Sequence, residues 1–254
     1  MVGSVVFFHA HPDDEAIFTG GTMARLTAAG HRVVLVVATG GELGLPVVDT
    51  PDHLAAIRRQ ETERAAALLG VDTVHSLGFH DSGMPGDPAN EAPGSFWSCS
   101  TDDAAGALAA ILTDEDANAL VVYDETGIYG HPDHIQVNRI GHLAAATAGV
   151  GVVYESTVDR EYLHFVETHL VAEAILTGDL GLVRSHIGTP TVAVSNTVDV
   201  RPVLETKRAA MAAHASQIPE TASALQLPVE RFAAVYGWEW YVRHGPPGPI
   251  DDLT

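Results

Sequence analysis

Cysteine, lysine and long apolar runs are scarce in this chain of 254 residues, and each scarcity excludes a class of protein. Cys99 is the single cysteine, so no internal disulfide, Cys-rich zinc module or Cys-x-x-Cys redox motif is possible. Lys207 is the single lysine, and 13 Lys and Arg stand against 33 Asp and Glu, which gives a net charge of −20. Because a polyanion repels phosphate backbones and anionic lipid surfaces, we expect neither a nucleic-acid partner nor membrane insertion.

No apolar run reaches the roughly 20 residues of a membrane-spanning helix, and the longest candidate, Leu143 to Tyr154, consists largely of Ala and Gly. A cleaved signal peptide would remove the polar motif that begins at His11, so we expect none. With 46% hydrophobic residues and no long polar tract, the chain has enough apolar material for one large domain. These features predict a cytoplasmic globular protein, and a homo-oligomer remains open.

Short apolar strands alternate with helices through the first 155 residues. This alternation predicts an α/β fold of Rossmann-like type, with a mostly parallel sheet and helices on both faces. The predicted strands are Val2 to His9, Arg32 to Ala38, Val71 to Phe79, Ala119 to Tyr123 and Gly151 to Glu155. The predicted helices are one with Pro12 at its first position that runs to Gly30, and then Asp52 to Leu69, Thr101 to Leu112 and Pro132 to Ala148.

The pattern is looser over residues 156–254, which we interpret as sheet edge, lid and C-terminal segment of the same single catalytic domain, 1–254, whose Rossmann-like core is 1–155. A tail rich in Pro and Gly from Gly245 is predicted to be surface coil. The elements predicted here are an amphipathic helix over Tyr162 to Leu176, a strand over Thr191 to Ser195, a helix over Pro202 to Ala215 and an aromatic-rich segment over Phe232 to Val242.

Two predicted strands are each followed by His-Pro-Asp, at His11 to Asp14 and at His131 to His134. Since the carboxyl ends of parallel strands meet at one edge of a sheet, the two clusters are expected to converge on one point. Together they offer three imidazoles, three Asp carboxylates and Glu15. Imidazole and carboxylate without thiolate suit Zn²⁺, with Fe²⁺ as the alternative, and a catalytic zinc usually has three protein ligands.

The spacing of the clusters suggests a role for each member. His11 and Asp14 are three residues apart across a helix start, and His134 occupies the matching position in the second cluster, so these three are the predicted ligands. Asp13 is then free to take a proton from metal-activated water, and His131 to stabilise or protonate developing charge, with Asp133 able to orient it. Capping alone explains one such cluster, because Asp and Pro are favoured in a first helical turn, but it explains two at one sheet edge poorly.

The motifs HAHPDDE, TGGELG and YGHPDH, after the first, second and fourth predicted strands, resemble the LmbE-like or PIG-L superfamily of zinc-dependent de-N-acetylases. The similarity extends to the segment Arg58 to Glu61, to FHDSGM at Phe79 to Met84 and to AAHASQ at Ala212 to Gln217, and therefore spans most of the chain. The last two segments favour the mycothiol-type branch and related bacterial deacetylases.

This resemblance implies a zinc-dependent hydrolase that removes an N-acetyl or other N-acyl group from an amino-sugar-containing small molecule or glycoside. It places zinc on His11, Asp14 and His134, the general base at Asp13 and an oxyanion-stabilising histidine at His131. In the mycothiol-type branch, residues that match Arg58 and Asp81 hold the sugar-like substrate, and one that matches Tyr129 assists at the scissile amide.

Several alternatives stay open on the sequence. Arg58 also fits a solvated helix surface, and Asp81 a simple turn. A mycothiol S-conjugate amidase would use the same centre, a non-haem Fe²⁺ oxygenase also uses two His and one carboxylate, and a non-catalytic Rossmann-like binding protein could retain a vestigial site. His9 is expected to pack inside the first strand, and His214 to cap, pack or contact substrate. Whether Asp13 or His131 protonates the leaving amine is undecided.

Overall fold

The computed structural model describes residues 3–44, 50–169 and 187–254. Its strands are β1 (Ser4–His9), β2 (Arg32–Thr39), β3 (Thr73–Phe79), β4 (Ala117–Tyr123), β5 (Val153–Thr157), β6 (Asn196–Asp199) and β7 (Trp238–His244). Its α-helices are α1 (Gly20–Ala28), α2 (Pro51–Leu69), α3 (Thr101–Asp114), α4 (Gly127–Gly130), α5 (Pro132–Ala148), α6 (Arg160–His169), α7 (Leu204–Ala213), α8 (Ser223–Gln226) and α9 (Val229–Tyr236). Within these residues, no helix is both long and apolar enough to cross a bilayer.

The described strands form one sheet in the order β3-β2-β1-β4-β5-β7-β6. The first five are parallel, whereas β7 pairs antiparallel with both β5 and β6. The predicted Rossmann-like, mostly parallel α/β sheet is confirmed. The chain leaves β1 toward β2 on one side and returns in β4 on the other, so the strand order reverses between β1 and β4. Ligands bind at the carboxyl ends of the strands beside such a reversal.

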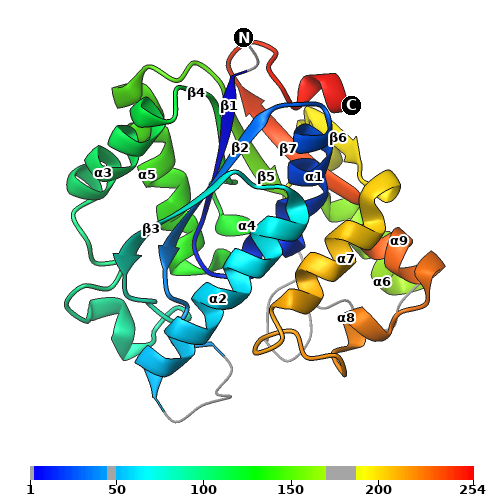
Figure 1. Cartoon of the computed structure of the whole chain (residues 1–254), viewed down its shortest axis with the longest axis horizontal. Coiled ribbons are helices and arrows are strands. Elements are labelled where there is room, and N and C mark those ends of the chain that lie inside the picture. Colours follow the sequence, from blue (N-terminus) through cyan, green and yellow to red (C-terminus); the bar gives the residue numbers. More distant parts are fainter. Residues whose placement is uncertain (1–2, 45–49, 170–186) are drawn as a thin grey trace.

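Helices cover both faces of the sheet and bury a separate apolar core on each (Figure 1). Alternate residues of a strand point to opposite faces, so Val5 and Phe7 of β1 pack toward α1, α2 and α7, whereas Val6 and Phe8 pack toward α3 and α5. The central strands β1, β2 and β4 are apolar on both faces because both of their faces are covered, whereas β3 at the sheet edge has alternate residues exposed. The carboxyl edge of the sheet thereby lies between two layers of packed helices.

The helix ends that the sequence predicts best have a fixed local cause. Helix α5 has the predicted bounds, since Pro132 is its first residue and Gly149, left-handed with φ of 74°, ends it. Helix α2 ends in the same way at Gly70, with φ of 77°. Glycine takes this conformation without the steric cost that other residues meet.

The sequence predicts that the first helix begins at Pro12, but the helix begins later. Asp13 is left-handed with φ of 104°, and a π-helical turn from Glu15 to Thr19 precedes α1. The backbone N–H of Asp13 donates to the carboxylate of Glu15 at 3.0 Å, and the guanidinium of Arg58 donates to the carbonyl of Pro12. These contacts hold the segment after β1 in a tight turn. Asp14 and His134 occupy matching positions in the sequence, but the backbone around them differs.

Residues 187–254 also depart from the sequence-based prediction. The strand expected over Thr191 to Ser195 is not formed: Thr191–Ala193 is a 3-10 turn, and strand pairing begins at Asn196, opposite Tyr241 of β7. The aromatic-rich segment divides into α9 and β7. The tail is held in place by Asp251, which accepts hydrogen bonds from Tyr154 and Asn196. The predicted helix over Tyr162 to Leu176 corresponds to α6 as far as His169, and the remainder lies outside the described residues.

Candidate metal centre and active site

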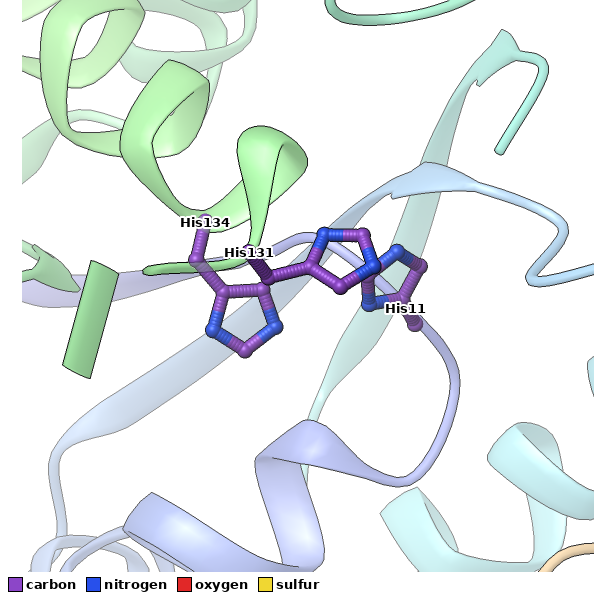
Figure 2. Close-up of side chains that lie close together, drawn as sticks. All are labelled: His11, His131 and His134. Carbon is purple, nitrogen blue, oxygen red and sulfur yellow. The ribbon is translucent and has the colours of Figure 1, made fainter. Parts of the chain in front are cut away.

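The two His-Pro-Asp clusters lie together at the carboxyl ends of β1 and β4. His11 follows β1, and His131 and His134 stand at the start of α5. The three imidazole rings gather there, as Figure 2 shows, with ring centres 4.6 Å apart for His11 and His131, 5.4 Å for His11 and His134, and 5.3 Å for His131 and His134. The predicted convergence of the clusters is therefore observed at the reversal of strand order.

One carboxylate oxygen lies between two of these rings. Asp14 Oδ2 is 3.2 Å from His11 Nδ1 and 3.3 Å from His134 Nε2. Burial alone would raise the pKa of Asp14, but His134 and His11 outweigh it and hold the pKa well below its ordinary value. Ligand atoms on a tetrahedral zinc, about 2.0–2.1 Å from the ion, are about 3.3 Å from one another. The donor types suit a divalent cation, and the two distances from Asp14 Oδ2 are close to this spacing.

Two further sets of potential ligands share His11 with this group. Ligand atoms of His11, His131 and His134 lie within 4.8 Å of one another, as do those of His11, Asp81, His131 and Asp133. Burial lowers the pKa of His11, yet Asp81 and Asp133 outweigh this effect and raise it well above its ordinary value. The surroundings of His11 therefore favour positive charge, which a metal cation can also supply.

Asp13 lies beside these ligands with its carboxylate toward Arg58, at 3.3 Å between Asp13 Oδ1 and Arg58 Nη2. Burial raises the pKa of Asp13 to about 6, against the lowering effect of Arg58 and with a further contribution from Asp14. Arg58 is buried, and it also donates to the carbonyls of Pro12 and Gly41. The structure thus places Arg58 inside the protein at Asp13, and not on a solvated helix surface.

Glu15 and His214 support this turn and were not singled out as a pair by the sequence. Both side chains are fully buried, and His214 Nε2 lies 2.5 Å from Glu15 Oε1, while Glu15 Oε2 accepts the backbone N–H of Asp13. The partners are 199 residues apart in the chain, so no local pattern indicates their contact. The sequence offers one indication of the contact, because the HPDDE and AAHASQ segments are both among those that resemble the PIG-L superfamily. His9 packs inside β1 as expected, between the hydroxyls of Tyr123 and Thr19.

His131 has a defined tautomer in its neutral form. Its Nδ1 accepts the backbone N–H of Asp133 at 3.1 Å, so a neutral ring carries its proton on Nε2. Burial lowers the pKa of His131 to about 2, and His11 and His134 contribute in the same direction. The carboxylate of Asp133 faces His11 Nε2 at 3.1 Å and accepts the backbone N–H of Ser82. Asp133 therefore orients His131 through its backbone, and its side chain orients His11.

The remaining predicted residues lie around the same opening. Tyr129 approaches His134 Nε2 with its hydroxyl at 3.5 Å, and Asp81 Oδ1 lies 3.7 Å from His11 Nε2. The opening is a cavity of about 380 Å³, and its lining includes Asp13, Arg58, Asp81, Tyr129, His131 and Gln217. Its size is within the range of small-molecule sites, and most of its lining residues are polar or charged. Seven of the nine predicted site residues line this cavity, whereas Asp133 and His134 are fully buried behind the lining and contact His11 and Asp14.

Sequence comparison identifies the family. The family model described as PIG-L, GlcNAc-PI de-N-acetylase, matches residues 6–145, more than half of the chain. The 1D-myo-inositol 2-acetamido-2-deoxy-alpha-D-glucopyranoside deacetylase of Thermobifida fusca is 35% identical over 281 aligned positions, which cover 98% of each protein. A protein of the same description from a Mycobacterium species is 37% identical and covers 99% of this chain and 87% of its own length.

Solved structures share the fold at lower identity. The N,N'-diacetylchitobiose deacetylase of Pyrococcus horikoshii aligns with a TM-score of 0.62 and 24% identity, covering 99% of this chain and 88% of that one. At such identity a likeness shows the fold alone, and chemistry must be argued from the site. The resemblance drawn from the motifs is confirmed by the sequence comparisons: the chain belongs to the PIG-L family of de-N-acetylases.

Proposed function

We propose that this protein is a metal-dependent hydrolase that removes an acetyl group from the amine of an amino-sugar-containing small molecule. One observation carries the proposal: a carboxylate oxygen of Asp14 lies within 3.3 Å of nitrogens of His11 and His134, beside Asp13 and at a polar cavity. Two imidazoles, one carboxylate and an adjacent carboxylate base are the parts that metal-assisted amide hydrolysis needs.

His11, Asp14 and His134 are the proposed ligands, and Zn²⁺ is the proposed ion. His131 is the competing third imidazole, but its Nδ1 is engaged by the backbone of Asp133, and its Nε2 is better used toward substrate. Nitrogen and oxygen donors without thiolate also accommodate Fe²⁺, so metal analysis of the isolated protein is part of the test. When bound, such an ion polarises the acyl carbonyl and lowers the pKa of water.

Asp13 is the proposed general base. With a pKa of about 6, the Asp13 carboxylate is mostly ionised at neutral pH and can accept a proton. Because this pKa is close to the working pH, the carboxyl group can also give the proton back. Arg58 and the Glu15 carboxylate fix the position of Asp13, one through its side chain and the other through its backbone N–H. Asp13 therefore takes a proton from the attacking water while the new C–O bond forms.

His131 is proposed to stabilise the negative charge that develops on the acyl oxygen. As a neutral ring with Nδ1 accepting, it presents an N–H at Nε2, which is a donor aimed by its other hydrogen bond. A ring with so low a pKa is not in the imidazolium form at neutral pH, so it does not serve as the acid. Asp13 is therefore the proposed donor to the nitrogen of the departing amine when the C–N bond breaks.

The proposed substrate is an N-acetylglucosamine joined to a polyol. The relatives from Thermobifida and Mycobacterium are named for a substrate of this kind. The polar lining of the cavity suits hydroxyl groups, with Asp81 and Gln217 facing it beside Arg58. The proposed place of action is the reducing cytoplasm, with which the free thiol of Cys99 is compatible.

The test is a panel of N-acetylated glucosaminides and mycothiol-type S-conjugates, incubated with zinc-replete protein, with the free amine detected. We expect release of amine from the glucosaminyl polyol, and a loss of about 10²–10⁴-fold in turnover for Asp13→Asn. The matched control is Asp114→Asn, which changes an exposed carboxylate at the end of α3 and should leave turnover unchanged. No amine from any acetylated compound, or full activity of Asp13→Asn, would overturn the proposal.

A further inference from the structure

A second group of potential metal ligands lies outside the active site, where α5, β5 and β7 meet. Glu155 Oε1 is 2.8 Å from His142 Nε2 and 3.2 Å from His244 Nε2. The ligand atoms of all three lie within 4.8 Å of one another. Within the part of the chain that the structure describes, this is the one group of three or more such residues separate from the catalytic cluster.

We propose that His142, Glu155 and His244 bind one further divalent cation of the Zn²⁺ class. Two imidazoles and one carboxylate are a ligand set used for zinc, and nitrogen donors favour Zn²⁺, Cu²⁺ or Ni²⁺ over Mg²⁺ or Ca²⁺. The 3.2 Å from Glu155 Oε1 to His244 Nε2 is close to the roughly 3.3 Å between ligands on a tetrahedral ion, and the 2.8 Å to His142 Nε2 is somewhat shorter. Three protein ligands leave a coordination position for water.

Access and charge both suit a cation at this place. The His142 and His244 side chains are 35% and 50% exposed, so an ion can enter from solvent, whereas Glu155 is only 11% exposed. Glu155 Oε1 accepts a hydrogen bond from the amide of Asn138 at 2.9 Å, on the side away from solvent. Asn138 also donates to the carbonyl of Tyr123, which fixes its amide and hence the carboxylate.

The second site and the active site share one helix. His134, Asn138 and His142 follow one another at intervals of four along α5, so they lie on one face, with His134 and His142 about 12 Å apart along the axis. That separation makes the two ions independent ligands of the protein. An ion held at once by α5, β5 and β7 would fasten the antiparallel edge of the sheet to its parallel core, and should therefore stabilise the fold.

The experiment counts zinc equivalents bound by tag-free, metal-stripped protein in competition with a chromophoric chelator. We expect two equivalents for the wild type and one for His142→Gln/His244→Gln, with at least a tenfold loss of affinity at the altered site. Glutamine can still donate to Glu155, which favours folding of the variant. The second equivalent should also raise the melting temperature of the wild type but not that of the double variant.

The matched control is His75→Gln, because His75 is half-buried and contacts one carboxylate, Glu115, at 2.9 Å. This variant should still bind two equivalents. The proposal is overturned if His142→Gln/His244→Gln binds as many equivalents as the wild type. Because the readout is stoichiometry at a site remote from Asp13, it is independent of whether the proposed deacetylation occurs.

Discussion

Replacing Lys207 with Met removes the cation of a buried ion pair. The pair connects helix α7 and strand β7 with helix α1, which follows the turn that contains Asp13. Lys207 Nζ in α7 lies 2.6 Å from Glu239 Oε1 in β7, and both side chains are 1% exposed. Glu239 also accepts the backbone N–H groups of Gly21 and Thr22 in the first turn of α1, each at 2.8 Å. The pair therefore ties three elements around the π-helical turn.

The two partners should not contribute equally. Breaking a buried ion pair from one side costs about 3–5 kcal/mol, because the other charge remains buried. After Lys207→Met, Glu239 still has two backbone donors and the Tyr241 hydroxyl at 3.3 Å, so the loss should be near the lower limit, about 3 kcal/mol. After Glu239→Gln, Lys207 keeps its charge without a carboxylate, and the loss should be near the upper limit, about 5 kcal/mol.

Urea and thermal unfolding of metal-replete protein measure these losses. For a chain of this size, 1 kcal/mol shifts the melting temperature by about 2–4 °C, so Lys207→Met should lower it by about 6–12 °C and Glu239→Gln by about 10–20 °C. Arg59→Met/Glu63→Gln is the control, because this ion pair is exposed and 3.9 Å apart, and it should give no measurable shift. A larger loss for Lys207→Met than for Glu239→Gln would refute the reasoning.

Two further predictions concern residues around the site. Burial lowers the pKa of His9 in the folded protein to about 4, whereas its pKa in the unfolded chain is near 6.5. Between pH 6.5 and pH 4 the unfolded chain binds a proton at His9 and the folded protein does not, so the free energy of unfolding decreases as the pH falls. At pH 5 this term costs the wild type about 2 kcal/mol relative to pH 7.5, and His9→Gln, compared by urea unfolding at both pH values, should lack it. Gly127→Ala should destabilise the fold by about 2 kcal/mol or more and weaken zinc binding, because Gly127 has φ of 65° and an added Cβ lies 2.7 Å from His134 Cβ. Unfolding and metal titration measure both effects.

Each of these has a result that contradicts it. An equal loss of stability on acidification in the wild type and His9→Gln would show that His9 is not held neutral. For Gly127→Ala the matched variant is Gly149→Ala, since Gly149 has φ of 74° with nothing within 4 Å of an added Cβ. It should lose only the conformational term of about 1–2 kcal/mol and bind zinc normally. Equal effects of the two substitutions would exclude crowding at His134.

The sequence predicts the fold well where a local cause fixes the structure. The apolar runs of β1 and β2 require burial on both faces, and Pro132 and Gly149 set the ends of α5 by their backbone preferences alone. The convergence of His11 and His134 follows from parallel strands alone, because their carboxyl ends share one edge. These inferences need no knowledge of distant contacts.

Other features depend on partners that are remote in the sequence. The left-handed turn at Asp13 is held by Arg58 and Glu15, and Glu15 in turn by His214, so the preference of Pro12 for a first helical position is overridden. Likewise, pairing with β7 decides that a strand begins at Asn196 and not at Thr191, although the residues before it are apolar. Local sequence patterns do not predict contacts between residues so far apart in the chain.

The measurement that tests the central claim most directly is the zinc content and turnover of Asp13→Ala and His134→Ala, determined side by side on the acetylated glucosaminyl polyol. Asp13 acts as base and His134 as ligand in this account. Asp13→Ala should therefore retain the catalytic zinc and lose turnover, whereas His134→Ala should lose both. If the two variants contain equal zinc at that site, or if Asp13→Ala turns over like the wild type, the assignment of ligand and base is wrong.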